Sequence, residues 1–182
     1  MSQRVRVVWT PELLDYDFGP GHPMAPFRLD LTIRLARSLG LLDHAEVEVV
    51  GAEPASDAVL LTAHEPEYVA AVRRASDGGP GDPARGIGTE DDPVFPGMHE
   101  AAARVVTGSR DAALAVWHGE VEHAVNLTGG MHHAMPGAAS GFCVYNDAAV
   151  AIRAQQTPRT HNHHAEARAP HPASAGQAPI SD

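Results

Sequence analysis

The chain has 182 residues, the length of one domain of ordinary size or of one domain followed by a tail. Its net charge of -10 argues against general binding to nucleic-acid backbones, which requires a basic face. The single cysteine excludes an intramolecular disulfide and any metal cluster built from cysteines, and no apolar run approaches the roughly 20 residues that span a membrane. We therefore expect a cytoplasmic protein with neither a nucleic-acid nor a membrane partner.

The first half of the chain alternates between strand and helix patterns. Leu31, Leu35 and Leu39 recur at a helical spacing, and Gly40 is suited to cap the end of that helix. Pro66 is well placed in the first turn of a second helix. The predicted elements are a strand at residues 4–10, an irregular loop rich in proline and glycine at 15–26, a helix at 27–39, a strand at 47–50, either a strand or the approach to a helix at 60–61, and a helix at 66–75.

The second half continues the same alternation. A loop is predicted for residues 77–88, a long helix for 96–118, a short strand for 123–127 and a further helix for 145–152. The long helix carries apolar side chains on roughly one side, namely Met98, Ala102, Val105, Leu114 and Trp117. Strands that alternate with helices predict an α/β fold with a mostly parallel sheet, and such sheets place their ligand sites at the carboxyl ends of the strands.

The composition changes abruptly after Ile152. Residues 153–182 contain one large aliphatic side chain, Ile180, and no helical or strand period, so we predict a disordered tail. Within it, the stretch from His161 to His164 resembles a metal-binding tract by composition only. We therefore divide the chain into a domain at 1–152 and a tail at 153–182. The change at Arg153 is typical of a truncated or frameshifted reading frame.

A pair of adjacent histidines follows the last predicted strand. Gly129 and Gly130 allow the backbone to leave strand geometry there, so that His132 and His133 could serve one pocket. Imidazoles suit proton transfer at neutral pH because their ordinary pKa is about 6.5. From the spacing alone, a pair of ordinary loop histidines explains the pattern equally well.

Three further segments contain candidate binding residues, each with a plainer explanation. Gly141 and Phe142 could form the wall of a slot, or Phe142 could simply belong to the core. Asp91 could bind the backbone of a substrate, or its acidic neighbourhood could cap the helix that follows. Arg28 could bind a small carboxylate, or it could be a surface charge.

Taken together and in this order, five segments resemble the histone deacetylase superfamily, and in particular its bacterial acetoin-utilisation branch. The segments are Asp17 to Met24 with Arg28, then His64 and Tyr68, then Glu90-Asp91 with Pro93-Val94-Phe95, then Gly130 to His133, and finally Ser140 to Cys143 with Asn146-Asp147. The resemblance extends from about residue 4 to residue 152. It implies an arginase/deacetylase-like α/β fold, of which this chain holds the N-terminal and therefore incomplete portion of a three-layer parallel sheet.

The resemblance also implies a function and roles for the candidate residues. The family hydrolyses ε-N-acetyl-lysine with one divalent metal, usually zinc. By resemblance, His133 is the general base and acid, supported electrostatically by His132. Gly141 and Phe142 match the tunnel wall, Asp91 the rim carboxylate, and Arg28 the channel for acetate. The implied partners are acetylated protein lysines, with acetyl-CoA synthetase as the partner associated with this branch.

The family's metal ligands have no counterpart in this chain, because no Asp-x-Asp-x-His motif follows residue 152. We therefore assign no metal ligand and expect the chain to be catalytically inactive. Two alternatives stay open: a non-catalytic module that binds acyl-lysine or a partner, and an amidohydrolase of polyamines or other small molecules. Without further strands, a sheet edge and one or both sheet faces should be exposed, which predicts poor stability, aggregation or the need for a partner.

Overall fold

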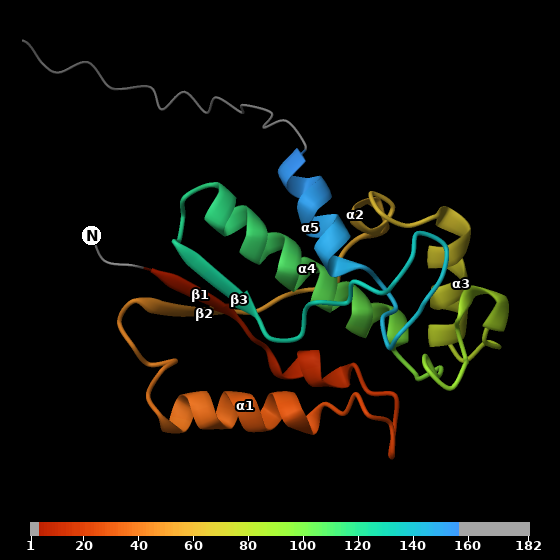
Figure 1. Cartoon of the computed structure of the whole chain (residues 1–182), viewed down its shortest axis with the longest axis horizontal. Helices are drawn as coiled ribbons and strands as arrows, with labels where there is room; N and C mark the ends of the chain where they lie inside the picture. The colour runs from red at the N-terminus through yellow and green to blue at the C-terminus, as the bar shows by residue number, and fades with distance from the viewer. Residues whose placement is uncertain (1–3, 157–182) are drawn as a thin grey trace, which may run out of the picture.

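The computed structural model describes residues 4–156, and its centre is a sheet of three parallel strands. These are β1 (Val5–Val8), β2 (Val47–Val50) and β3 (His123–Asn126), arranged in the order β2-β1-β3 (Figure 1). In this register Val5 lies opposite both Val47 and His123. All three strands therefore end at the same edge of the sheet, which confirms the predicted parallel α/β arrangement.

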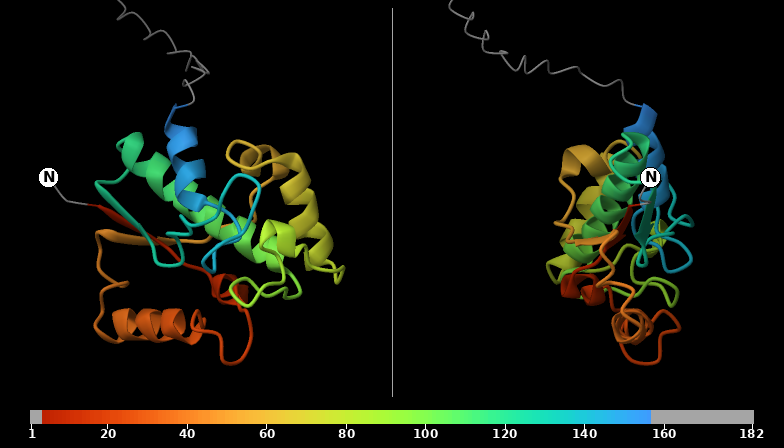
Figure 2. Two further views of the ribbon diagram at one scale, coloured as in Figure 1. Left: turned by 45° about the vertical axis from the view of Figure 1, so that its right-hand side comes forward. Right: turned by 90° about the vertical axis from the view of Figure 1, so that its left-hand side faces the viewer.

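Helices connect the strands, and the sheet lies between α4 and α1 (Figures 1 and 2). The elements are η1 (Pro11–Asp15), α1 (Phe27–Ser38), α2 (Asp57–Leu60), α3 (Pro66–Ser76), η2 (Pro83–Arg85), α4 (Met98–Trp117) and α5 (Asp147–Gln156), where η marks a 3-10 helix. The segment at residues 60–61 thus belongs to a helical turn and not to a strand. None of the helices in the described part is both long and apolar enough to cross a bilayer.

One face of the sheet packs tightly against α4. Gly108 in the middle of that helix faces Val8 and Asn126, and a Cβ atom at this position would come within 3.1 Å of the Val8 side chain. A glycine is therefore what allows the helix backbone to approach the sheet. On its other sides α4 contacts α3 and α5, so it forms the centre of the helical layer.

On the opposite face of the sheet Val7 of the central strand is buried, whereas the two outer strands and the apolar stripe of α1 are more exposed. Val49 and Val125 lie on the same face as Val7 and are 42% and 41% exposed. Along α1 the buried residue is Ile33, whereas Phe27, Leu31, Leu35 and Leu39 are each more than half exposed. The leucine spacing predicted the helix correctly, but the side that it marks faces solvent.

Helices α4 and α5 differ from the prediction in the exposure of one side chain and in the position of one end. Trp117, expected on the apolar side of the long helix, is 61% exposed at the end of α4. The final helix begins at Asp147 and continues to Gln156, so residues 153–156 are helical and the predicted disorder does not begin at Arg153. The rest of the predicted tail, with the histidines at 161, 163 and 164, lies outside the described residues.

Candidate functional site

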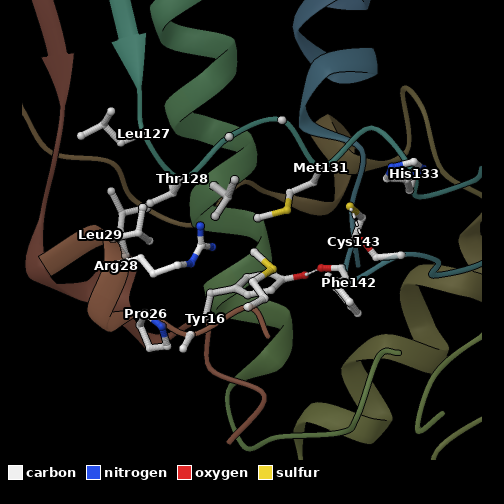
Figure 3. Close-up of a pocket in the computed structure, with 17 residues that line it drawn as sticks. Tyr16, Pro26, Arg28, Leu29, Leu127, Thr128, Met131, His133, Phe142 and Cys143 are labelled. Carbon is white, nitrogen blue, oxygen red and sulfur yellow. Dashed lines mark hydrogen bonds between the residues drawn. The ribbon is translucent and has the colours of Figure 1, made fainter. Parts of the chain in front are cut away.

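A cavity of about 460 Å³ opens beside the carboxyl ends of β1 and β3. Four of the six predicted site residues line it: Arg28, His133, Gly141 and Phe142. Arg28 extends into the cavity from α1, and His133 lies at the opposite side (Figure 3). The remaining wall is mainly apolar, with side chains from Leu13, Tyr16, Met24, Leu29, Val105, Leu127, Met131 and Cys143 among its residues. The cavity therefore combines an apolar wall with one cation and one imidazole.

The histidine loop departs from strand geometry at its glycines, as predicted. Gly130 has a φ of +94°, and a tight turn follows in which the N–H of His132 bonds the Gly130 carbonyl at 2.8 Å. The rings of His132 and His133 lie 4.4 Å apart with an angle of 37° between their planes. His133 lines the cavity, whereas His132 does not. Of the two histidines, His133 is therefore the one that forms part of the cavity wall.

Gly141 approaches the His133 ring very closely. A Cβ atom at position 141 would lie 3.1 Å from the Cβ and Cγ atoms of His133, and the backbone there has a φ of +55°. Both the space and the conformation favour glycine. The close approach sets one side of the His133 ring against the cavity wall.

Phe142 has a left-handed backbone with a φ of +69°, which is strained for a side chain of this size. The buried Tyr16 hydroxyl donates to the Phe142 carbonyl at 2.9 Å and accepts the N–H of Val144 at 3.1 Å (Figure 3). Tyr16 therefore holds the backbone on the C-terminal side of Phe142 in place. Strained residues that are held this way cluster at ligand sites. Phe142 lines the cavity and also packs against the core, so the two predicted roles are compatible.

Asp91 lies on the exposed loop before α4 and does not line the cavity. It is connected to the cavity wall through His22, whose Nε2 donates to the Asp91 carbonyl at 3.2 Å. The Met24 N–H donates to Nδ1 of His22 at 3.1 Å, which places the ring proton on Nε2. The His22 ring packs 4.6 Å from that of Phe142. Asp91 does not cap α4, because the residue preceding that helix is Gly97.

Asp92, which the sequence did not single out, is a buried carboxyl group beneath this wall. It is 1% exposed, and its Oδ1 atom has no hydrogen-bond partner among residues 4–156. Burial raises the pKa of Asp92 from 3.8 to about 6, and the neighbouring Asp91 adds to the effect, while His22 and the Phe142 N–H oppose it. A run of acids in a loop gave no signal for which of them would be buried.

Arg28 is both exposed and part of the cavity, so its two predicted roles are compatible. Within the described range 4–156 its guanidinium forms no ion pair. An unpaired guanidinium that faces a partly apolar cavity can bind a small carboxylate with two hydrogen bonds.

Asp147 anchors the start of the histidine loop, a role that the sequence did not reveal. Its buried carboxylate accepts the N–H groups of Gly130 at 3.0 Å and Met131 at 2.7 Å, and it also accepts the Ser109 hydroxyl. A Cβ atom at Gly129 would lie 2.5 Å from Ser109 Oγ and 2.7 Å from Asp147 Oδ2. Only glycine therefore fits between the loop and its anchor.

The described residues do not fit the catalytic zinc that the resemblance implies. Between residues 4 and 156, no three His, Cys, Asp or Glu side chains lie close enough together to hold a metal ion, and a catalytic zinc typically has three protein ligands. Cys143 also lines the cavity, but its thiol donates to the Gly141 carbonyl at 3.3 Å, and burial raises its pKa. We therefore derive no chemical step through a metal.

The chain is similar to known proteins over most of its length. Residues 22–166 match the histone deacetylase domain, a match that ends beyond the predicted boundary at Ile152. The chain is 42% identical over 149 residues to the acetoin utilization protein AcuC of Bacillus subtilis (strain 168), with 80% of this chain and 38% of that protein covered. It is 37% identical over 155 residues to histone deacetylase 2 of Oryza sativa subsp. japonica, with 83% and 30% covered.

A solved structure supports the same relationship at the level of the fold. The crystal structure of an HDAC homolog from Aquifex aeolicus superimposes with a TM-score of 0.73 at 27% sequence identity. The match covers 85% of this chain and 41% of that one. The chain thus spans about two fifths or less of the length of these relatives. The described sheet is an incomplete form of the arginase/deacetylase fold.

Proposed function

Because the chain belongs to the histone deacetylase family, we propose that its cavity receives an ε-N-acetyl-lysine side chain and that the associated reaction is hydrolysis of the acetyl amide. One observation carries the proposal: a single cavity brings together Arg28, His133, Gly141 and Phe142 from three separate parts of the sequence. Because these residues also match the family's motifs, chance assembly is a poor explanation.

The chemistry of the cavity suits this substrate. Acetylation removes the charge of a lysine side chain, so its stem and acetyl group can enter an apolar slot at little cost. His133 would take a proton from the attacking water and return one to the leaving amine, the task for which imidazole is suited at neutral pH. Arg28 would bind the acetate product at the side of the same cavity that lies opposite His133 (Figure 3).

We further propose that the described residues bind the acyl-lysine without completing its hydrolysis. Their cavity lacks a set of metal ligands in the range 4–156, and zinc dependence is part of the family's chemistry by resemblance. The natural partner is an acetylated protein, for which acetyl-CoA synthetase is the candidate associated with the acetoin-utilisation branch.

The experiment is to measure binding and turnover on the same 182-residue chain. Fluorescence anisotropy gives the Kd for a labelled peptide with one acetyl-lysine, and the same peptide with free lysine is the control. A fluorogenic acetyl-lysine peptide, with and without added zinc, reports hydrolysis. Phe142→Ala should weaken binding of the acetylated peptide by about tenfold, the effect of losing roughly 1.4 kcal/mol of apolar contact.

The outcomes separate the parts of the proposal. Preferential binding of the acetylated peptide without turnover supports it as stated. Zinc-dependent turnover that His133→Ala abolishes supports the reaction but contradicts the claim that this chain does not complete it. Equal affinity for both peptides, with no turnover, overturns the assignment of the cavity.

A further inference from the structure

Two polar residues next to the cavity have no place in the proposed chemistry. They are His64, in the turn before α3, and Asn146, directly before α5. Neither lines the cavity, although both belong to the motifs that the sequence singled out. Their hydrogen bonds converge on the loop that carries His133, which suggests that they act on the loop and not on the substrate.

The side chain of Asn146 holds the backbone on both sides of His133. Its Nδ2 donates to the carbonyl oxygen of His132 at 3.3 Å and to that of Ala134 at 2.9 Å. Its Oδ1 accepts the N–H of Ala149 at 2.9 Å and so caps the start of α5. Since one end of the amide must donate and the other must accept, the orientation of the group is fixed.

His64 in turn holds Asn146. Its Nε2 accepts the backbone N–H of Asn146 at 2.9 Å, so that nitrogen carries no proton. The proton is then on Nδ1, which faces the Pro136 carbonyl at 3.3 Å. His64 is 4% exposed, and burial lowers its pKa, which is consistent with the neutral ring that these partners require. One buried imidazole thus connects Asn146 to the end of the histidine loop.

We propose that Asn146 is a positioning residue that determines how His133 is presented to the cavity, and that His64 fixes Asn146 in place. The inference rests on the proposed function for the role of His133. With both flanking carbonyls held by Asn146 and the start of the loop held by Asp147, the backbone of His133 is fixed on each side. The ring then has only its own rotamers to choose from, and Gly141 closes one side of it.

The first test uses Asn146→Ser in the 182-residue chain. Serine keeps an oxygen that can cap α5 but lacks the amide that donates to the two carbonyls. In protein with ¹⁵N-labelled histidine, the ring signal of His133, assigned with His133→Gln, should change from one sharp signal to a broadened or split one. Affinity for the acetyl-lysine peptide should fall by about tenfold, because a His133 ring that is no longer held in place alters the cavity wall that contacts the acyl group.

Val72→Ala is the matched control for a loss of stability alone. Val72 is fully buried in α3 and does not line the cavity. This variant should lower the Tm and leave both the His133 signal and the peptide affinity unchanged. If Asn146→Ser lowers the Tm but leaves the His133 signal and the affinity as they are in Val72→Ala, Asn146 has a structural role only and the inference is wrong.

A second pair of variants tests the contribution of His64. His64→Gln can keep an acceptor where Nε2 lies, whereas His64→Asn keeps a donor near Nδ1 and loses that acceptor. We expect the first to behave like the wild type and the second like Asn146→Ser. Equal behaviour of the two would contradict the role of His64, and this pair also decides the matter should Asn146→Ser fail to fold.

The two proposals can fail separately. If the wild-type chain does not bind the acetylated peptide, the proposed function fails, yet the His133 signal still tests whether Asn146 positions the ring. If the wild type binds and the His133 signal is unaffected by Asn146→Ser, the positioning role fails while the proposed function stands.

Discussion

The side chain of Asp92 is a buried carboxyl group, and its ionisation opposes folding. Its pKa is raised to about 6 mainly by burial, so the folded chain binds this proton more tightly than the unfolded chain does. The contribution of Asp92 to stability should therefore fall as the pH rises from about 4 to about 6, by an amount on the order of 3 kcal/mol, and it should stay low at higher pH.

Asp92→Asn should remove this pH dependence. We expect the stability of the variant, relative to that of the wild type, to be higher at pH 7.5 than at pH 4. Chemical denaturation at the two pH values measures it, and Asp43→Asn, at an exposed position, is the control. A difference between variant and wild type that is the same at both pH values would show that Asp92 ionises freely in the folded state.

Gly141 and Gly119 share a left-handed backbone but differ in their surroundings. A Cβ atom would meet the His133 ring at Gly141, whereas nothing lies within 4 Å of one at Gly119. Alanine at either position should cost about 1 kcal/mol of stability. Only Gly141→Ala should also weaken binding of the acetyl-lysine peptide, since it displaces His133. Equal effects of the two variants on affinity would rule out a special role for Gly141.

At the scale of single residues, the sequence could identify those whose type and spacing indicate a chemical role. Two histidines after a pair of glycines are recognisable by type and spacing. The role of Tyr16 is not, because its hydroxyl acts on Phe142, which is distant in the sequence and becomes its neighbour only in the folded chain. Likewise, nothing in the acidic run distinguishes buried Asp92 from exposed Asp91.

Among the secondary-structure elements, α1 is the one that should govern solubility. Its exposed stripe contains Phe27, Leu31, Leu35 and Leu39, and an exposed apolar patch on this scale promotes association. Leu31→Glu combined with Leu35→Glu should reduce self-association in light scattering and reduce the fluorescence of the apolar dye ANS, with the circular dichroism spectrum unchanged.

The same helix offers a control for that experiment. Ile33 is 1% exposed, so Ile33→Glu buries a charge and should unfold the chain. If the double glutamate variant associates as strongly as the wild type, the stripe is not the surface responsible.

The leucine spacing predicted that α1 is a helix, because a period near four residues has one interpretation. It did not predict which neighbour the stripe faces. That depends on how α1 is placed against the sheet, which no local pattern encodes. The strands were likewise recognisable as apolar runs, whereas the end of α5 was misplaced because alanine-rich and glutamine-rich sequence supports a helix without a large apolar stripe.

For the whole molecule, the central strand is the part on which cooperative unfolding should depend. Val8 is 1% exposed between the sheet and α4, and Trp9 beside it is buried. Val8→Ala should cost about 2 kcal/mol. In a Trp117→Phe background, Trp9 fluorescence and circular dichroism should give the same lowered denaturation midpoint. Separate midpoints would show that the sheet and the helices unfold independently.

The order of the strands also has a consequence for synthesis on the ribosome. β1 emerges first, yet it lies in the middle of the sheet, and both of its neighbours come later: β2 after residue 47 and β3 after residue 123. One edge of β1 can pair with β2 early, but its other edge must stay unpaired while more than a hundred further residues are translated. Such delayed pairing slows folding and makes early binding by a chaperone an advantage during translation.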